Sequence, residues 1–213
     1  MQKTENKSEK LSSFRKDFPY LCVMSVLVSF GGWIGENISR YFGSRTMDSR
    51  FHLLPFLSPY GLLVLLLYAA LRDPDRIAFF GRPVFKKINR KTKLLSNLLC
   101  LLVITAAGFF GELLVGTFWE KAFGVVLWDY TNHSYCFTRY TCLMTTILYG
   151  VGGYLFFRLL FFPLFRQIKK LPRKTAKILG YSLGVLILID TAIMGIHIAV
   201  FGKAPIYWSV RLR

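Results

Sequence analysis

The chain has 213 residues, of which 54% are apolar and 16% aromatic, and its mean hydropathy is +0.42. Only 18% of the residues are charged, whereas soluble domains carry about 25%, so the composition excludes an ordinary soluble protein and favours an integral membrane protein. The formal net charge of +17 would suit a nucleic-acid binder, but the Lys and Arg residues cluster in short gaps between apolar stretches, which argues against nucleic acid as a partner.

Residues 1–17 are polar and are expected to form a cytoplasmic tail. Five apolar stretches follow, four of them free of Asp, Glu, Lys and Arg for at least 18 residues and the last interrupted only by Asp190. Such lengths match a hydrocarbon core of about 30 Å. We therefore expect an all-α integral membrane protein in which residues 18–213 form one transmembrane domain. Its five or so helices are expected over 18–39, 51–71, 94–120, 140–165 and 178–202.

The basic residues of the gaps predict the topology. When alternate gaps are taken together, 20 Lys and Arg residues fall on one side and eight on the other. Cytoplasmic loops carry the excess of Lys and Arg, so we expect a cytoplasmic N-terminus, an outer C-terminus and a multi-pass location in the cell inner or plasma membrane. The most basic gaps, 72–93 and 158–177, are expected to contact anionic lipids.

The second apolar stretch contains Pro55 and Pro59, which predict that its helix begins with Ser58 as the N-cap. Only about 14 residues then remain before Arg72, or about 21 Å of helix, which is too short to span a bilayer. Residues 51–57 are expected to enter the membrane as irregular backbone. Its N–H and C=O groups then need hydrogen-bond partners from the protein or from a water-filled cavity.

An internal repeat is visible. Residues 31–36 read GGWIGE and residues 107–112 read AGFFGE, and each copy is followed by a Tyr-Gly pair, at 60–61 and 149–150. The second copy is longer by 13 residues between its Glu and its Tyr. Two helix pairs of the same orientation predict a parallel repeat with a fifth helix added.

Glu36 and Glu112 lie near the predicted outer ends of the first and third helices. Ionisable residues are expensive at such depth and point to function. If the two repeats face each other, the carboxylates line one outward-opening cleft. The alternative is an interfacial Glu paired with Arg40, Arg50 or Arg139.

The next outer stretch carries Glu120, Trp128, Asp129 and Tyr130. Carboxylates and aromatic faces together can bind a polar or cationic ligand. The alternative is that Trp and Tyr form an interfacial belt.

Asp190 lies midway between Lys177 and Lys203, and His197 follows seven residues later on the same helical face, about 10 Å away. These two residues are the candidates for a proton or ion relay. Pairing of Asp190 with a polar group of a neighbouring helix remains open.

The four cysteines show no metal-ligand spacing, so we assign no metal and no cofactor. Cys136 and Cys142 lie six residues apart on the predicted outer side. A disulfide and two free thiols both remain open there.

Four segments carry a family resemblance: GGWIGE, SPYG, GELLVGTFWEKAFGVVLWDY and CFTRYTCLMTTILYG. They resemble the ABC-transporter type IV (CmpB-like) family of bacterial membrane proteins, over roughly residues 28–163. The LLPFLSPYG segment departs from the Pro-Ile-Tyr-Gly that the family usually has. The positions that match the family pattern are Glu36, Tyr60, Gly61, Glu112, Glu120, Trp128, Asp129, Tyr130 and Cys142. From them we take as predicted substrate-binding residues Glu36, Tyr60, Glu112, Glu120, Trp128, Asp129 and Tyr130.

The function expected from these observations is a small membrane transporter, or the permease subunit of one, with an outward-facing carboxylate and aromatic substrate cleft. The sequence has no Walker A motif, so ATP-driven transport needs a separate ATPase subunit, and a homo-oligomer is a further candidate partner. The alternatives are a membrane-embedded enzyme acting on a lipid-linked or envelope substrate and a non-catalytic membrane partner protein. We assign no catalytic residues, because no nucleophile–His–acid set is visible.

Overall fold

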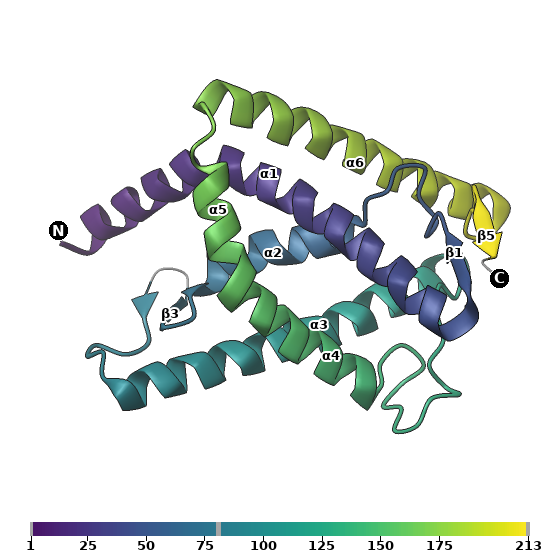
Figure 1. Cartoon of the computed structure of the whole chain (residues 1–213), viewed down its shortest axis with the longest axis horizontal. Helices are drawn as coiled ribbons and strands as arrows, with labels where there is room; N and C mark the ends of the chain where they lie inside the picture. The colour runs from purple at the N-terminus through teal and green to yellow at the C-terminus, as the bar shows by residue number, and fades with distance from the viewer. Residues whose placement is uncertain (1, 80–81, 212–213) are drawn as a thin grey trace. The chain divides into compact units, whose positions relative to one another are not determined.

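The computed structural model of the chain describes residues 2–79 and 82–211, and it describes the side chains of residues 14–71, 73–79 and 82–211. Most of the described chain is helical (Figure 1). The helices are α1 (Gln2–Ser44), α2 (Ser58–Leu71), α3 (Arg90–Phe123), α4 (Leu143–Leu155), the π-helix η1 (Phe156–Phe161), α5 (Phe162–Ile168) and α6 (Arg173–Phe201). The short strands are β1 (Thr46–Asp48), β2 (Arg72–Asp73), β3 (Arg76–Phe79), β4 (Arg82–Pro83) and β5 (Ser209–Arg211).

Four helices in the described residues are long and apolar enough to cross a membrane: Phe14–Ser44, Arg90–Phe123, Leu143–Ile168 and Arg173–Phe201. The third is continuous through α4, η1 and α5. The helical membrane architecture is therefore confirmed with four helices of spanning length, where about five were expected. The remaining apolar helix, α2, has 14 residues and begins at Ser58, where the proline pattern placed its start.

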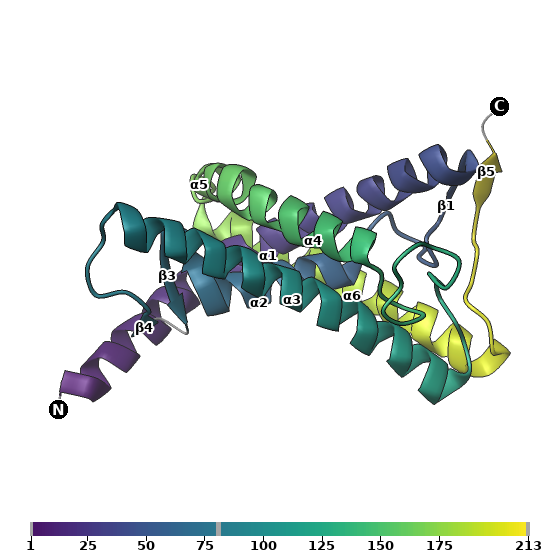
Figure 2. The ribbon, with the colours of Figure 1, turned by 90° about the horizontal axis from the view of Figure 1, so that it is seen from below.

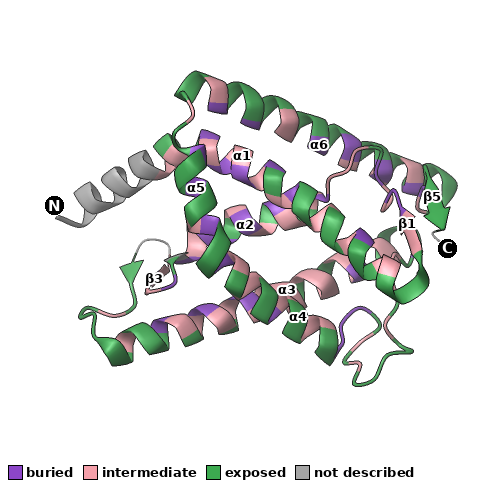
Figure 3. Cartoon of the chain, viewed as in Figure 1, coloured by how far each residue is buried: buried purple, intermediate pink, exposed green. Residues whose placement is uncertain are grey.

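Exposed residues run along the long helices (Figure 3), and many of them are large and apolar. On α6, Leu188 and Val200 each remain 66% exposed, and on α3 Leu114 remains 68% exposed. Continuous apolar surface of this kind is unfavourable in water and marks contact with a membrane. The same helices bury small or polar residues toward their neighbours, among them Ser96 and Asp190.

The chain divides into two compact units, and unit 1 comprises Met1–Leu66 and Leu164–Arg213. In unit 1, α1 packs along α6 (Figure 1), and Gly180 allows the close approach, since an added Cβ there would lie 2.8 Å from the Cys22 Cβ. Strand β1 pairs with β5 in antiparallel register, with Met47 opposite Val210. This pairing ties the chain after α1 to the end of the chain after α6.

Unit 2 comprises Leu67–Pro163, and its main contact is between α3 and α4. Strands β2, β3 and β4 form a three-stranded antiparallel sheet beside α3. The buried Ser96 hydroxyl accepts from the Ile77 N–H (2.7 Å) and donates to the Pro74 carbonyl (2.8 Å). At the other end of α3, residues 124–142 form a loop that lies against the start of α4 (Figure 2).

The Tyr-Gly pair of unit 1 packs on α1 at two small residues. A Cβ added to Gly32 would lie 2.6 Å from the Tyr60 ring, and a Cβ added to Gly61 would overlap the Ser29 hydroxyl. Each glycine therefore allows a close approach that a larger residue would prevent.

Unit 2 repeats these contacts. A Cβ added to Gly108 would lie 3.2 Å from the Tyr149 Cβ, and a Cβ added to Gly150 would overlap the Thr105 side chain. Thr105 and Gly108 have the same spacing as Ser29 and Gly32 in unit 1. The repeat seen in the sequence thus coincides with a repeated helix contact inside each unit.

These contacts predict the effect of adding a methyl group. Gly61→Ala and Gly150→Ala are expected to lower the thermal unfolding midpoint in detergent, because overpacking costs about 1–3 kcal/mol. In the matched controls Gly31→Ala and Gly152→Ala nothing lies within 4 Å of the added Cβ, so the midpoint should hold or rise with the better helix propensity of Ala. Equal midpoints in the two sets would contradict the close packing.

Candidate functional site

Glu36, on the last third of α1, is held by two donors in unit 1. The Tyr60 hydroxyl, from the first turn of α2, donates to its Oε1 at 2.6 Å, and the Arg50 guanidinium pairs with its Oε2 at 3.0 Å. The Glu36 side chain is 22% exposed and that of Arg50 is 15% exposed. A carboxylate so placed interacts more strongly than it would in open water, because the surroundings screen it less.

The segment after α1 brings Arg50 to this position. The fully buried Asn37 accepts the Asp48 N–H (2.8 Å), while the Asp48 carboxylate pairs with Arg40 (3.0 Å) and accepts the Arg50 N–H (2.9 Å). Arg50 and Phe51 then take φ values of +52° and +71°. Positive φ at such residues costs of order 1–3 kcal/mol and persists only where neighbouring contacts impose it.

Asp190 is 4% exposed and accepts three hydrogen bonds in unit 1. The donors are the His52 ring at Nδ1 (3.2 Å) and the backbone N–H groups of Leu53 (2.9 Å) and Leu54 (3.3 Å). Residues 51–57 were expected to be irregular backbone needing such partners, and Asp190 supplies them for the N–H groups of Leu53 and Leu54. His52 was not among the predicted site residues, although a single histidine inside an apolar segment was a signal for it.

His197 contacts a different group. Its Nδ1 lies 3.1 Å from the Lys203 carbonyl, and its ring is tilted by 42° against that of Phe201, with the centroids 4.6 Å apart. The partners that the structure gives Asp190 lie in the irregular segment before α2 and not on a neighbouring helix. A relay between Asp190 and His197 stays a prediction.

Glu112 is the corresponding carboxylate of unit 2. The Tyr130 hydroxyl donates to its Oε1 (3.1 Å) and the Thr145 hydroxyl donates to its Oε2 (3.2 Å). Thr145 lies in the first turn of α4, so this carboxylate, like Glu36, receives a tyrosine hydroxyl and a donor from the following part of its own unit.

Arg139 joins two of the predicted site residues. Its guanidinium contacts Glu120 at 2.7 Å and Asp129 at 2.9 Å. Two hydrogen bonds from Thr131 (2.7 and 2.8 Å) and the charge of Arg139 hold the pKa of the Asp129 carboxyl below its usual value. Because Arg139 remains 44% exposed, this triad fixes geometry more than it adds stability.

Trp128 anchors the same loop to α3. Its indole Nε1–H donates to the Tyr140 carbonyl (3.2 Å), and the two rings meet edge to face at 5.9 Å. The Tyr140 ring in turn covers Gly116 on α3, where a Cβ would overlap it. Trp128 therefore has a structural contact within unit 2, beyond the interfacial role that its residue type suggests.

The family comparison assigns the class of the chain. The model of the family described as putative ABC-transporter type IV matches residues 23–194, well over half of the sequence. The chain belongs to this family. The resemblance carried by the GGWIGE, SPYG and WDY segments is thereby confirmed, and with four helices of spanning length the chain is a multi-pass membrane protein of the ABC-transporter type. No curated protein and no solved structure matches the chain.

Within this family member, the seven predicted substrate-binding residues fall into three groups: Glu36 with Tyr60, Glu112 with Tyr130, and Glu120 with Asp129 and Trp128 around the loop hairpin. The first group is in unit 1 and the others are in unit 2. Their assignment to a substrate, and a cleft shared by both units, stay predictions.

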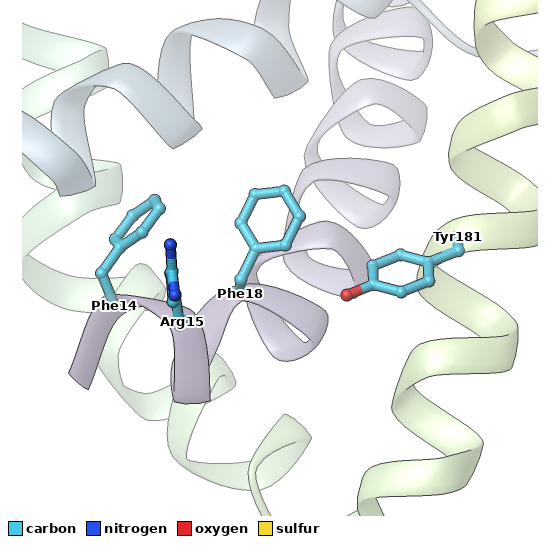
Figure 4. Close-up of a pocket in the computed structure, with 4 residues that line it drawn as sticks. All are labelled: Phe14, Arg15, Phe18 and Tyr181. Carbon is cyan, nitrogen blue, oxygen red and sulfur yellow. The ribbon is translucent and has the colours of Figure 1, made fainter. Parts of the chain in front are cut away.

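One pocket of unit 1 is lined by none of these residues. It has a volume of about 410 Å³ and is lined by Phe14, Arg15, Phe18 and Tyr181 (Figure 4). The Tyr181 hydroxyl points toward Phe18, and the two rings are 6.2 Å apart. Aromatic rings beside a basic residue at the start of a spanning helix are typical of the membrane–water interface.

The Arg139 contacts predict how the loop responds to a substitution. Arg139→Gln removes the charge that joins Glu120 to Asp129, so residues 124–142 should be cleaved faster by a protease added to the protein in detergent. The matched control is Lys121→Gln, which removes an exposed charge at the end of α3 and should leave the cleavage rate unchanged. Equal rates in both variants would show that Arg139 does not order the loop.

Proposed function

We propose that the chain is the membrane-embedded permease subunit of an ABC-type transporter, and that the Glu36 and Glu112 groups contact the substrate. The observation that carries this proposal is the shared construction of the two groups. Each has a carboxylate near the predicted outer end of a long helix, held by a tyrosine hydroxyl within its own unit. The family assignment supports transport as the class of activity.

Carboxylates held beside tyrosine and tryptophan rings favour a cationic or polar substrate. In unit 1 the charge of Glu36 is already balanced by Arg50 at 3.0 Å. A cationic substrate would replace the Arg50 guanidinium at Oε2, while the Tyr60 hydroxyl keeps its bond to Oε1. In the absence of substrate, Arg50 thus compensates the charge of the largely buried Glu36 carboxylate.

The energy source in this proposal is a separate ATPase subunit. A candidate docking surface is the basic gap 72–93, which carries the β2–β3–β4 sheet of unit 2. Asp75 in this gap accepts from Asn97 (3.0 Å) and pairs with Lys93 (3.5 Å), and these contacts lower the pKa of its carboxyl. A loop tied to α3 in this way can pass movement of a docked subunit to the helix.

The proposal requires the topology given by the basic residues. Ser44→Cys and Lys86→Cys are introduced separately into a chain whose four cysteines are replaced by Ser, because Cys136 and Cys142 lie on the predicted outer side. A membrane-impermeant maleimide added to intact cells should then label the first variant and spare the second. Both positions are exposed, so access to the reagent is limited by the membrane alone. Labelling of Lys86→Cys from outside would overturn the orientation.

The carboxylates themselves provide the test of function. In cells lacking the chain, a panel of cationic and neutral polar solutes is screened for uptake that the wild-type chain restores. Glu36→Gln and Glu112→Gln should reduce that uptake by about tenfold or more, since loss of a charged hydrogen bond is worth about 1.5–3 kcal/mol. Membrane amounts should stay unchanged.

The matched control for these variants is Glu9→Gln, which neutralises a carboxylate of the predicted cytoplasmic tail, residues 1–17. It should transport as the wild type does. Wild-type uptake in both glutamate variants would refute a role of these carboxylates in substrate binding.

A further inference from the structure

Cys136 and Cys142 lie opposite each other in the outer loop of unit 2. The two residues form an antiparallel backbone bridge, although they belong to no named strand. On one side of the pair, the Phe137 N–H donates to the Thr141 carbonyl at 3.0 Å. The five residues between the cysteines therefore form a short hairpin.

A second backbone hydrogen bond lies on the other side of the pair, from the Leu143 N–H to the Tyr135 carbonyl at 3.0 Å. Because both bonds are made by neighbours and not by the cysteines themselves, the cysteines occupy a non-hydrogen-bonded position of the ladder. There the Cα atoms of facing residues lie about 4.5 Å apart and the side chains leave the same face. That separation is within the range of about 4.4–6.8 Å that a disulfide requires.

Both thiols are free and are held only weakly. The Cys136 Sγ, half-buried, is directed at the carbonyls of Tyr130 and His133. The buried Cys142 Sγ lies 3.5 Å from the Thr145 hydroxyl. The described residues contain no cluster of three His, Cys, Asp or Glu side chains that would hold a metal ion there. To form a sulfur–sulfur bond, each cysteine would have to rotate about its Cα–Cβ bond and give up these contacts.

We propose that Cys136 and Cys142 form a disulfide on the outer side of the membrane. The oxidant is the disulfide of an extracytoplasmic thiol–disulfide oxidoreductase. The more accessible Cys136 attacks it as the thiolate, which gives a mixed disulfide and releases one oxidoreductase thiol. The Cys142 thiolate then attacks the Cys136 sulfur, forms the internal bond and releases the second thiol. Two electrons and two protons pass from the chain to the oxidoreductase.

The disulfide would fix the groups that surround it. The hairpin that it closes carries Arg139, which joins Glu120 to Asp129, and Tyr140, which covers Gly116. Cys142 is also the N-cap residue of α4. A disulfide would thus tie the loop to the start of α4, about one turn before Thr145, whose hydroxyl binds Glu112. This proposal depends on the outer location of the loop and is independent of what the protein transports.

The test uses the full wild-type chain in native membranes. Membranes are quenched with acid, denatured in detergent and treated with a polyethylene-glycol maleimide, with or without earlier reduction by dithiothreitol. The chain has four cysteines, so the disulfide predicts two additions without reduction and four after it. Four additions without reduction would overturn the proposal.

Two variants show which cysteines are paired. The chain with Cys22→Ala and Cys100→Ala should accept no maleimide before reduction and two after it. Adding Cys136→Ser to that chain should expose Cys142, with one addition before reduction. A dimer that dithiothreitol resolves would show pairing between chains and would also overturn the proposal.

Discussion

A backbone that leaves helical geometry in apolar surroundings must find hydrogen-bond partners in the protein, and in unit 1 this requirement falls on Asp190. Its carboxylate, on α6, accepts the N–H groups of Leu53 and Leu54 in the irregular segment. Since α6 packs along α1, this segment is fixed on both helices, and the start of α2 is fixed with it. The position of Tyr60 follows, and with it the hydroxyl that reaches Glu36. The Asp190 carboxylate on α6 thus helps to determine the geometry around Glu36.

The two units reach a similar carboxylate environment by different means. Both use a glycine or small hydroxyl residue to bring two helices together, and both supply a tyrosine hydroxyl to the carboxylate. In unit 1 the second donor is the cation of Arg50, delivered by a strained backbone. In unit 2 it is the neutral hydroxyl of Thr145, delivered by the first turn of α4. The helix contacts are repeated, whereas the polar groups around Glu36 and Glu112 differ.

Features that depend on local sequence could be predicted. Prolines and hydropathy placed the start of α2 at Ser58 and the other helices at apolar stretches, because these signals act within a few residues. Long-range pairings could not. Helical periodicity placed His197 on the same helical face as Asp190, but periodicity carries no information about contacts with other segments. The histidine that contacts Asp190 is His52, 138 residues away. The Arg139 triad was missed for the same reason, since no rule relates a loop cation to two carboxylates at different separations.

The greater length of the second copy explains where its loop contacts come from. Of the 13 additional residues between Glu112 and the Tyr-Gly pair, six lengthen the loop 124–142, while the others extend the end of α3 and the start of α4. The conformational cost of a loop rises only slowly with its length. That cost still has to be offset by contacts that order the loop. Arg139 ties it to α3 through Glu120, and Trp128 ties it to the hairpin that covers α3. The longer second copy can therefore bring the Tyr130 hydroxyl and the first turn of α4 to the Glu112 carboxylate. The close helix contact at the Tyr-Gly pair, which both copies share, is kept.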